Sequence, residues 1–468
     1  MLSKIAFRSI LRERRRSFMT VLAIAVGGVA IVLFGEFVAF IQAGLETNAV
    51  VKVGHLTVFH TGYFDYGAGN PAAFGITDYP GVIRLINEDP ELKPKINVIT
   101  PTVSLTGIAG NFDIDASKTF LGTGFVPSDR DRMQQWDEHS VNRHRVLPES
   151  GLRNDDDTRA VVGVGLARVL GLCEPLKLQD CPPRVALTSA TAASPGTAAP
   201  DDIAALAKAE RDTSQVSKAA VGPRLDLLAA TATGAPNVLS IFVTGAEAQG
   251  ARELDESFVA MHFALAQRLL YGRGEQKAVG IVLQLHRTED LPAARARLLT
   301  LFKKNNLDLE VRDFAELQPF YKQAVGMFRA IFMFISLIMG VIVLFTVVNT
   351  MGMSVMERTN EIGTARALGL RRGGIRYLFV VEGAMLGAVG ATIGVVVAQA
   401  IALLFNLSGA TWTPPAQAAP VPLEVVTSGV GPLLLAAWVG LVVMAQVAAL
   451  IPANRAARLK VVDALRHV

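Results

Sequence analysis

Four long runs of apolar residues dominate the chain and predict four membrane-spanning helices. A helix needs about 20 apolar residues to cross the hydrocarbon core of a bilayer. The runs give spans at 18–42, 327–356, 377–405 and 425–453. Each run is much longer than a buried strand, and a helix in a soluble core rarely stays apolar on every side over such a length. The pattern therefore predicts a four-span membrane protein.

Lysine and arginine are sorted along the chain in a way that predicts its orientation. They crowd the segment before the first span, the loop 357–376 and the tail 454–468, whereas the connection 406–424 has none. By the positive-inside rule, both termini and the loop 357–376 are cytoplasmic. The long segment 43–326 and the short loop 406–424 are then periplasmic, on the outer side of a bacterial inner membrane.

Residues 1–17 have basic side chains on one helical face and apolar side chains on the other. This pattern predicts an amphipathic helix on the cytoplasmic membrane surface, with a basic solvated tail as the alternative. The alternative for the first span is a cleaved signal peptide, although its apolar run is about twice the roughly 7–15 residues of that role.

The segment 43–326 predicts an α+β domain. Alternating and β-branched runs indicate strands at 50–59, 97–107, 118–124, 240–244, 278–285 and 307–313. We expect a helix over 288–304 with Thr288 as its N-cap, and another from Ala315 into the second span. Residues 186–236, rich in Ala, Thr, Ser and Pro, indicate a flexible insertion or weakly packed helices. The fold class is thus membrane α-helical, with four transmembrane helices, plus a large α+β extracytoplasmic domain.

Composition excludes several classes of protein. Two cysteines among 468 residues exclude a cysteine-rich metal scaffold. Because Cys173 and Cys181 are close in sequence and predicted to face an oxidising space, we expect a local disulfide, with two buried thiols as the alternative. The net charge of +4 is small for this length, and we expect no nucleic-acid partner.

No catalytic motif is present in the sequence. It contains no G-x-x-x-x-G-K-[ST] loop, no H-E-x-x-H pair and no G-x-S-x-G elbow. The acidic run 155–157 does not converge on one point in an extended chain, and the histidines are scattered, so we expect no metal site. Glu36, Arg329 and Glu382 lie near predicted span ends, where an interfacial position is favoured over a functional one.

The loop between the second and third spans carries the most information. It reads ERTNEIGTARALGLRRGGI over residues 357–375. We expect the second span to continue into the cytoplasm as a charged helix, to stop at Gly369 in a left-handed conformation, and to be followed by a tight basic turn at 371–374. The alternative is an ordinary solvated hairpin loop.

This stretch closely resembles the E-R-x-x-E-I-G-x-x-[KR]-A-[LI]-G hallmark of the MacB/FtsX/LolC–LolE-type ABC transporter permease superfamily, a four-span, mechanotransmission type. The C-terminal PANRAARLKVVDALRH resembles the tail of the same superfamily, with Val461 or Val462 where proline is common. Residues 163–172 and 243–270 resemble the outer-domain pattern of those permeases. The resemblance fades at 186–236.

The resemblance implies a permease that pairs with a second copy or a paralogue and binds two copies of a separate ABC ATPase. ATP and Mg would be bound by that ATPase, with no cofactor and no catalytic residue in this chain. It implies an ATPase-coupling element made of Glu357, Arg358, Glu361, Ile362, Gly363, Arg366, Ala367 and Gly369.

The function expected from the resemblance is lipoprotein release or export of an amphiphilic substrate from the outer face of the membrane. Membrane lipid, a lipoprotein substrate, a carrier or a periplasmic adaptor would be the further partners. The alternative is an FtsX-like transmembrane regulator that works an envelope partner such as a cell-wall hydrolase and transports nothing. An enzyme in the outer domain is disfavoured because the catalytic motifs are absent.

Overall fold

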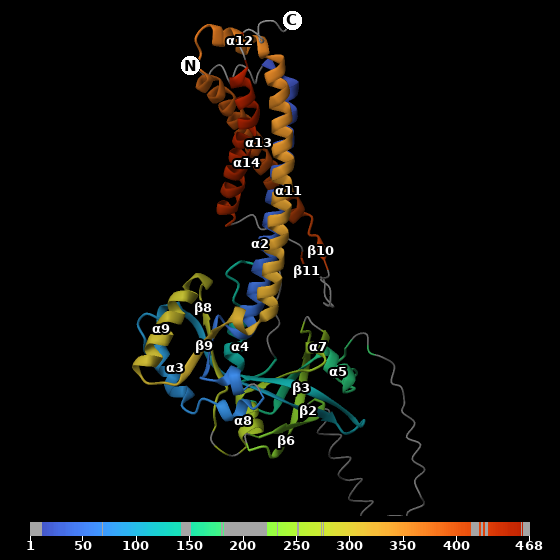
Figure 1. The fold of residues 1–468 in the computed structure, drawn as a ribbon. Helices are drawn as coiled ribbons and strands as arrows, with labels where there is room; N and C mark the ends of the chain where they lie inside the picture. The colour runs from blue at the N-terminus through green and yellow to red at the C-terminus, as the bar shows by residue number, and fades with distance from the viewer. Residues whose placement is uncertain are drawn as a thin grey trace, which may run out of the picture. The chain divides into compact units, whose positions relative to one another are not determined.

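The chain divides into two units, each with its own core. The computed structural model describes residues 12–67, 69–141, 151–178, 181, 222–231, 233–249, 252–272, 274, 276–412, 421–422, 425, 429–459 and 461. The helical unit comprises 12–45, 320–412 and the described residues from 421 onward. The sheet domain comprises the described residues of 46–319. Figure 1 labels the elements of both.

Four long apolar helices confirm the prediction of four helices able to cross a membrane. They are α2 (Arg14–Val53), α11 (Pro319–Glu357), α13 (Arg372–Leu407) and α14 (Gly431–Arg458). The helical unit also contains the short helix α12 (Thr359–Ala367) and two paired two-residue strands, β10 (Thr411–Trp412) and β11 (Val421–Pro422). Helices α2, α11 and α13 extend beyond both ends of the predicted spans, because their polar ends stay helical where the apolar run has finished. Helix α14 instead begins later than the span predicted at 425–453 and also ends later.

Helices α2 and α11 run antiparallel beside each other within the helical unit (Figure 1). Near the start of α2, Arg16 pairs with Glu357 at the end of α11. Further along, the rings of Phe34 and Phe332 stack with centroids 6.3 Å apart. These contacts join early residues of one helix to late residues of the other, which fixes the antiparallel order.

Small residues allow α13 to approach its neighbours closely. A Cβ on Gly387 would lie 2.8 Å from the Cβ of Ala445 on α14, and a Cβ on Gly394 would lie 2.8 Å from the carbonyl oxygen of Ala25 on α2. Such distances leave no room for a side chain. Close backbone approach at small residues is a general way in which membrane helices associate, because lipid provides no hydrophobic drive for their contact.

Two charged residues expected near the membrane interface are instead buried among helices, which corrects the prediction. Glu36 is fully buried on α2 and accepts a hydrogen bond from Nε2 of Gln399 on α13. Glu382 is also buried, on α13. Arg329 is exposed on α11, as the interfacial interpretation requires. The two carboxylates face other helices because each has a polar partner there, which a hydropathy profile does not show.

The sheet domain is α+β, with nine hydrogen-bonded strands in the order β3-β7-β4-β6-β5-β2-β8-β1-β9. The strands are β1 (Leu56–His60), β2 (Ile96–Asn111), β3 (Ala116–Phe125), β4 (Arg159–Gly163), β5 (Arg224–Ala230), β6 (Pro236–Glu247), β7 (Phe258–His262), β8 (Gly280–Leu285) and β9 (Leu309–Asp313). Because β3 also pairs with β2, the strands from β3 to β2 in that order close into a barrel. The long strand β2 serves both parts: residues 96–102 pair with β8, and residues 103–111 pair with β3.

Two apolar cores correspond to the two parts of the sheet domain. The barrel core contains Phe120, Leu227 and Ile241, together with residues of α5 (Val164–Val169) and α8 (Phe263–Tyr271). The second core joins β1, β8 and β9 to α3 (Tyr79–Glu88) and α9 (Leu291–Lys304), with Phe302 as its largest fully buried side chain.

The sheet domain also contains shorter elements. They are α4 (Pro127–Gln134), α7 (Arg252–Asp255), α10 (Phe314–Leu317) and the turns η1 (Tyr63–Gly67), η2 (Pro71–Phe74), η3 (Lys93–Lys95) and η4 (Thr288–Asp290).

The predicted strand at 50–59 is wrong in its first half. Helix α2 continues to Val53, and the burial of Val50 in this last part of the helix outweighs its strand preference. The chain turns at Gly54, whose φ is +71°, and β1 begins only at Leu56. The remaining predicted strands correspond to β2, β3, β6, β8 and β9 with shifted ends.

Two predicted helix boundaries are also wrong. Helix α9 begins at Leu291 with Asp290 at its N-cap, because a proline in its first turn sets the start. Thr288 instead uses its hydroxyl to donate to Glu46. The helix expected from Ala315 into the second span is interrupted at Gln318, because the residue before Pro319 is restricted to extended backbone.

The insertion expected at 186–236 is shorter at its C-terminal end. Residues 224–230 form β5, whose alternating burial places Leu225 and Leu227 in the barrel core. Residues 186–221, like residues 1–11 of the expected amphipathic helix, lie outside the described part of the chain. Cys173 and Cys181 are joined in the structure, with 2.05 Å between their sulfur atoms.

Candidate functional site

The segment that carries the sequence hallmark forms a separate short helix, α12, at one end of the helical unit (Figure 1). The expectation that α11 continues through it is wrong, because α11 ends at Glu357 and Arg358 has φ −99° and ψ 15°. Helix α12 then runs over Thr359–Ala367. The break at Arg358 lets its side chain turn inward while α12 takes a new direction.

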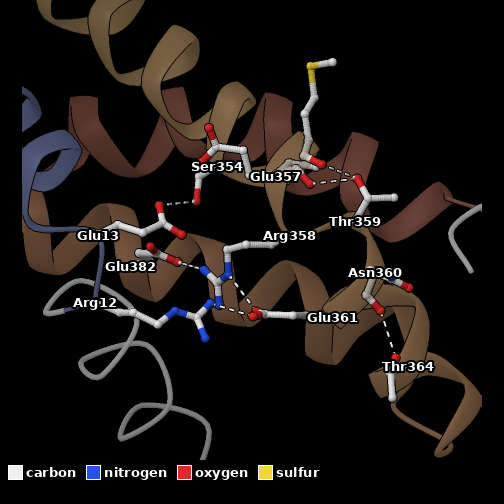
Figure 2. Close-up of polar contacts among 12 residues, drawn as sticks. Arg12, Glu13, Ser354, Glu357, Arg358, Thr359, Asn360, Glu361, Thr364 and Glu382 are labelled. Atoms are coloured by element: carbon white, nitrogen blue, oxygen red, sulfur yellow. Dashed lines mark hydrogen bonds and ion pairs between the residues drawn. The ribbon is translucent and has the colours of Figure 1, made fainter. Parts of the chain in front are cut away.

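Arg358 is the inner anchor of this segment. Its side chain is 9% exposed, and its Nη1 donates to Oε2 of Glu382 on α13 at 3.3 Å (Figure 2). Its Nε donates to Oε2 of Glu361, one turn along α12, at 3.2 Å. The guanidinium also lies over the ring of Phe379, 5.8 Å from its centroid. One arginine thus joins α12 to α13 through a planar, multivalent group that a lysine cannot replace.

Two arginines, one just before α2 and one in its first turn, pair with the outer side of the same segment. Arg12 donates to Oε1 of Glu361 at 2.6 Å, and Arg16 makes two hydrogen bonds to the carboxylate of Glu357. Burial is the largest influence on the pKa of Glu361 and would raise it, but the hydrogen bonds from Arg12 and Arg358 and their charges together lower it. Glu361 therefore remains ionised and connects two arginines from different parts of the chain.

The C-terminal end of α12 has the expected glycine stop. Gly369 has φ +97°, and its N–H donates to the carbonyl of Arg366 while the N–H of Leu370 donates to the carbonyl of Ala365. This pair of bonds is the Schellman motif, which satisfies the last carbonyls of the helix. The basic turn expected at 371–374 is shorter than predicted, because α13 already begins at Arg372.

Arg366 forms a third link. Its Nη1 donates to the backbone carbonyl of Leu459, just after α14. Helix α12 is therefore attached to α13 through Arg358 and to the end of α14 through Arg366.

The eight residues of the expected coupling element separate into an inner and an outer set. Arg358, Ile362 and Gly363 are buried, and Arg366 is half-buried. The exposed members are Glu357, Glu361, Ala367 and Gly369. Buried members position the segment, and only the exposed members are available to a partner.

The outward surface of α12 includes residues that the sequence interpretation missed. Asn360, Thr364, Ala367 and Leu368 are all exposed, and their spacing of four, three and one residues places them on one helical face. Leu368 is 84% exposed, the highest value among the exposed large apolar residues of the described chain. We name Asn360, Thr364, Ala367 and Leu368 the outer face of α12. The sequence signal for this face was a leucine, Leu368, directly after a charged segment.

A second cluster of titratable groups lies in the sheet domain. His139 Nε2 lies 3.0 Å from Oε1 of Glu46, and the hydroxyl of Thr288 donates to the same oxygen at 2.6 Å. His55 Nε2 lies 3.1 Å from that hydroxyl, while its Nδ1 accepts a hydrogen bond from the N–H of Leu285. This arrangement makes Nε2 the protonated nitrogen of neutral His55.

The two histidines of this cluster have opposite pKa shifts. Burial lowers the pKa of His55 to about 4, so it is neutral at pH 7. The hydrogen bond to Glu46 raises the pKa of His139, because the carboxylate favours its charged form. Ligand atoms of Glu46, Glu138 and His139 also lie within 4.8 Å of one another, a grouping that could hold a cation. The three come from two distant segments, so sequence spacing gave no signal for it.

The acidic run 155–157 does not form such a group. Asp155, Asp156 and Asp157 each pair with a different arginine: Arg153, Arg159 and Arg268. Their carboxylates therefore diverge, as expected for a solvated loop.

Comparison with known proteins places the helical unit in a known class. Residues 333–461 match the family described as FtsX-like permease C-terminal. This range contains most of α11 and all of α12, α13 and α14, so it includes the whole coupling segment. Together with four helices able to cross a membrane, the match defines a multi-pass permease domain.

Three relatives extend this result. The lipoprotein-releasing system transmembrane protein LolC of Neisseria meningitidis serogroup B is 31% identical over 183 residues, which are 37% of this chain and 43% of LolC. The macrolide export ATP-binding/permease protein MacB of N. meningitidis serogroup A is 27% identical over 195 residues, 41% of this chain and 28% of MacB. The ABC transporter permease YtrF of Bacillus subtilis is 36% identical over 81 residues, 17% of this chain and 19% of YtrF.

The helical unit thus contains an FtsX-like permease domain, and the chain is similar to members of the MacB/FtsX/LolC superfamily of ABC transporter permeases. The matched region spans less than half the length of each of these relatives. The name of MacB places an ATP-binding part and a permease in the same protein.

Proposed function

We propose that this chain is the permease subunit that couples ATP hydrolysis by a separate ABC ATPase to movement of its sheet domain on the other side of the membrane. The observation that carries the proposal is the construction of α12. Its inner residues Arg358 and Arg366 attach it to α13 and to the end of α14, while its outer face is exposed. A short helix that is fixed from within and exposed on the outside has the form of a docking element.

The distribution of charge supports a cytoplasmic position for α12. The arginines at 14–16, 371–372, 376, 455 and 458 all lie at the ends of the long helices next to α12. Positive charge of this kind is retained on the cytoplasmic side of bacterial membranes. The sheet domain, which follows α2 and precedes α11, is then periplasmic.

The proposed substrate is a lipoprotein or another amphiphile already in the outer leaflet. The names of LolC and MacB assign lipoprotein release to one relative and macrolide export to the other. Both substrates combine an apolar part with a polar part. In this proposal, a conformational change passes through the helices to the periplasmic domain. Such a change would lift a substrate from the outer face, so the substrate would not have to cross the bilayer.

The docking element is tested by Leu368→Asp. An exposed apolar anchor in the centre of an interface contributes about 2 kcal/mol or more, so the charged variant should bind the ATPase about thirtyfold more weakly. The assay is co-purification of the ATPase subunit that accompanies the wild-type chain, together with ATP hydrolysis in vesicles.

The matched control is Leu254→Asp, which changes a 47% exposed leucine in the sheet domain. It should leave ATPase binding unchanged. Equal ATPase binding by wild type and Leu368→Asp would refute docking on the outer face of α12.

The transport step needs its own experiment. Vesicles that contain the permease, its ATPase and a labelled lipoprotein should release the lipoprotein only with ATP. An FtsX-like regulator would release nothing, and the full-length chain would instead retain a cell-wall hydrolase through its sheet domain. That result would replace the transport proposal while leaving the role of α12 intact.

A further inference from the structure

A groove lies between α11 and α14, at the end of the helical unit where α12 begins. It encloses about 820 Å³. One wall is formed by α11 between Phe345 and Met356, and the other by Pro452, Arg455 and Leu459. Its surface is mainly apolar, with phenylalanine, valine, methionine, proline and leucine side chains. Such a surface, on two helices able to cross a membrane, could accept an acyl chain.

The groove has a single charged residue among those that line it. Arg455 is exposed, and its side chain makes no hydrogen bond or ion pair with any residue in the described part of the chain. Asn349, on the opposite wall, is also exposed and has no side-chain hydrogen bond within the described residues. Neither wall provides an anion that could pair with the guanidinium of Arg455.

The dimensions of the groove match one leaflet of a bilayer. From Phe345 to Met356, the rise along α11 corresponds to on the order of 16 Å. One leaflet contributes about 15 Å of hydrocarbon, so this wall is about as long as one leaflet is thick. Arg455 lies where the apolar run of α14 changes to polar residues, so it is level with the phosphates.

We propose that this groove binds an anionic phospholipid of the leaflet next to α12. An acyl chain lies along α11 and the headgroup phosphate pairs with Arg455. Basic sites between membrane helices attract anionic headgroups, with about 1 kcal/mol per arginine near the surface. A second copy of this chain would fill the apolar volume, but the one carboxylate on its α11 and α14, Glu357, already pairs with Arg16.

The position of the groove gives the lipid a regulatory effect. Thr359 lines the groove and is the first residue of α12. A bound lipid therefore contacts the element that we propose docks on the ATPase, and it should stiffen that element. This regulatory effect depends on the proposed function, whereas the binding of the lipid does not.

Retention of lipid by the purified full-length chain tests the charge. The chain is incubated in detergent with equal amounts of phosphatidylglycerol and phosphatidylcholine, repurified and examined by native mass spectrometry. Wild type should retain phosphatidylglycerol preferentially, and Arg455→Gln should reduce this preference about fivefold. Arg458→Gln is the matched control, since Arg458 is exposed on the same helix outside the groove. It should keep the preference.

A second pair of variants tests the groove itself. Gly352 lines the groove, and a Cβ added there meets no atom within 4 Å, so Gly352→Leu fills the space without a clash. Gly326 also lies on α11 with open space around it but outside the groove, so Gly326→Leu is the control. Leucine favours a helix more than glycine does, so neither change should unfold α11.

Lipid retention should fall in Gly352→Leu and persist in Gly326→Leu. The proposal is overturned if wild type shows no preference for phosphatidylglycerol, or if Arg455→Gln and Gly352→Leu retain it as wild type does. A change from dimer to monomer in Gly352→Leu with unchanged lipid retention would overturn it in favour of a second copy in the groove. None of these measurements involves an ATPase, so they remain interpretable if the coupling role fails.

Discussion

Breaking the ion pair between Arg358 and Glu382 should destabilise the helical unit more than breaking any exposed pair. The two side chains are 9% and 6% exposed, and the nitrogen and oxygen atoms that pair are 3.3 Å apart. Removal of one member of a buried pair leaves the other charge in a poorly solvated place. Replacement of both by apolar residues of similar size removes that penalty.

The magnitudes differ between the two single variants. Arg358→Met leaves Glu382 without its arginine and should reduce the free energy of unfolding by about 3 kcal/mol. Glu382→Met should reduce the free energy of unfolding by less, about 2 kcal/mol, because Arg358 keeps its hydrogen bond to Glu361. The double variant should come within about 1 kcal/mol of wild type, which gives a coupling energy of about 4 kcal/mol.

The assay is a double-mutant cycle on equilibrium unfolding in mixed detergent micelles, followed by circular dichroism. The control is Arg153→Met, because Arg153 and Asp155 form an ion pair whose side chains are 72% and 69% exposed. That control should change stability by less than about 1 kcal/mol. If the double variant is destabilised by the sum of the two single losses, Arg358 and Glu382 are not coupled and the inner anchor of α12 is wrongly assigned.

Three further predictions concern single sites. The pKa of His55 is about 4 in the folded chain, so the unfolded chain binds a proton first as the pH falls. The free energy of unfolding should therefore fall by about 3 kcal/mol between pH 6.5 and 4. His55→Asn should remove most of this pH dependence, which unfolding curves measured at several pH values would show. Gly369→Val should lower the free energy of unfolding by about 1–2 kcal/mol, because φ at this position is +97°. Gly373→Ala is the control and should leave stability unchanged, because Gly373 lies in the first turn of α13. Thermal unfolding of both variants tests this prediction. Replacing Cys173 and Cys181 by serine should lower the free energy of unfolding by about 2–3 kcal/mol, because the unfolded chain gains conformational entropy without the disulfide. An unchanged melting temperature would show that the disulfide does not stabilise the fold.

The hydrophobic pattern predicted the long helices well because a membrane helix is determined by one property repeated over many residues. The sum over about 20 positions tolerates exceptions, so Glu36 did not obscure α2. Helix breaks depend on single residues and were missed. The interruption at Gln318 follows from one proline, and the break at Arg358 from contacts that this side chain makes elsewhere in the fold.

Strands were predicted correctly where apolar and polar residues alternate clearly along the sequence. They were missed or misplaced where packing in the folded chain determines the local structure. The segment 224–230 alternates perfectly in burial, yet its neighbours rich in Ala and Thr made it look like part of an insertion. Residues 49–53 show the opposite case, in which the β-branched Val50, Val51 and Val53 stay helical and Val50 is fully buried. Local preference is weak compared with burial in both places.

The candidate site shows why a motif alone does not separate structural from exposed residues. Helix α12 has nine residues, fewer than the number at which an isolated helix is stable in water. Its conformation must therefore come from attachments, and the arginines Arg12, Arg358 and Arg366 provide them through α2's N-terminal flank, α13 and the end of α14. Any displacement of α12 is then applied to three parts of the helical unit at once. The buried residues of the hallmark make this transmission possible, and the partner is left to recognise the outer face that they hold in place.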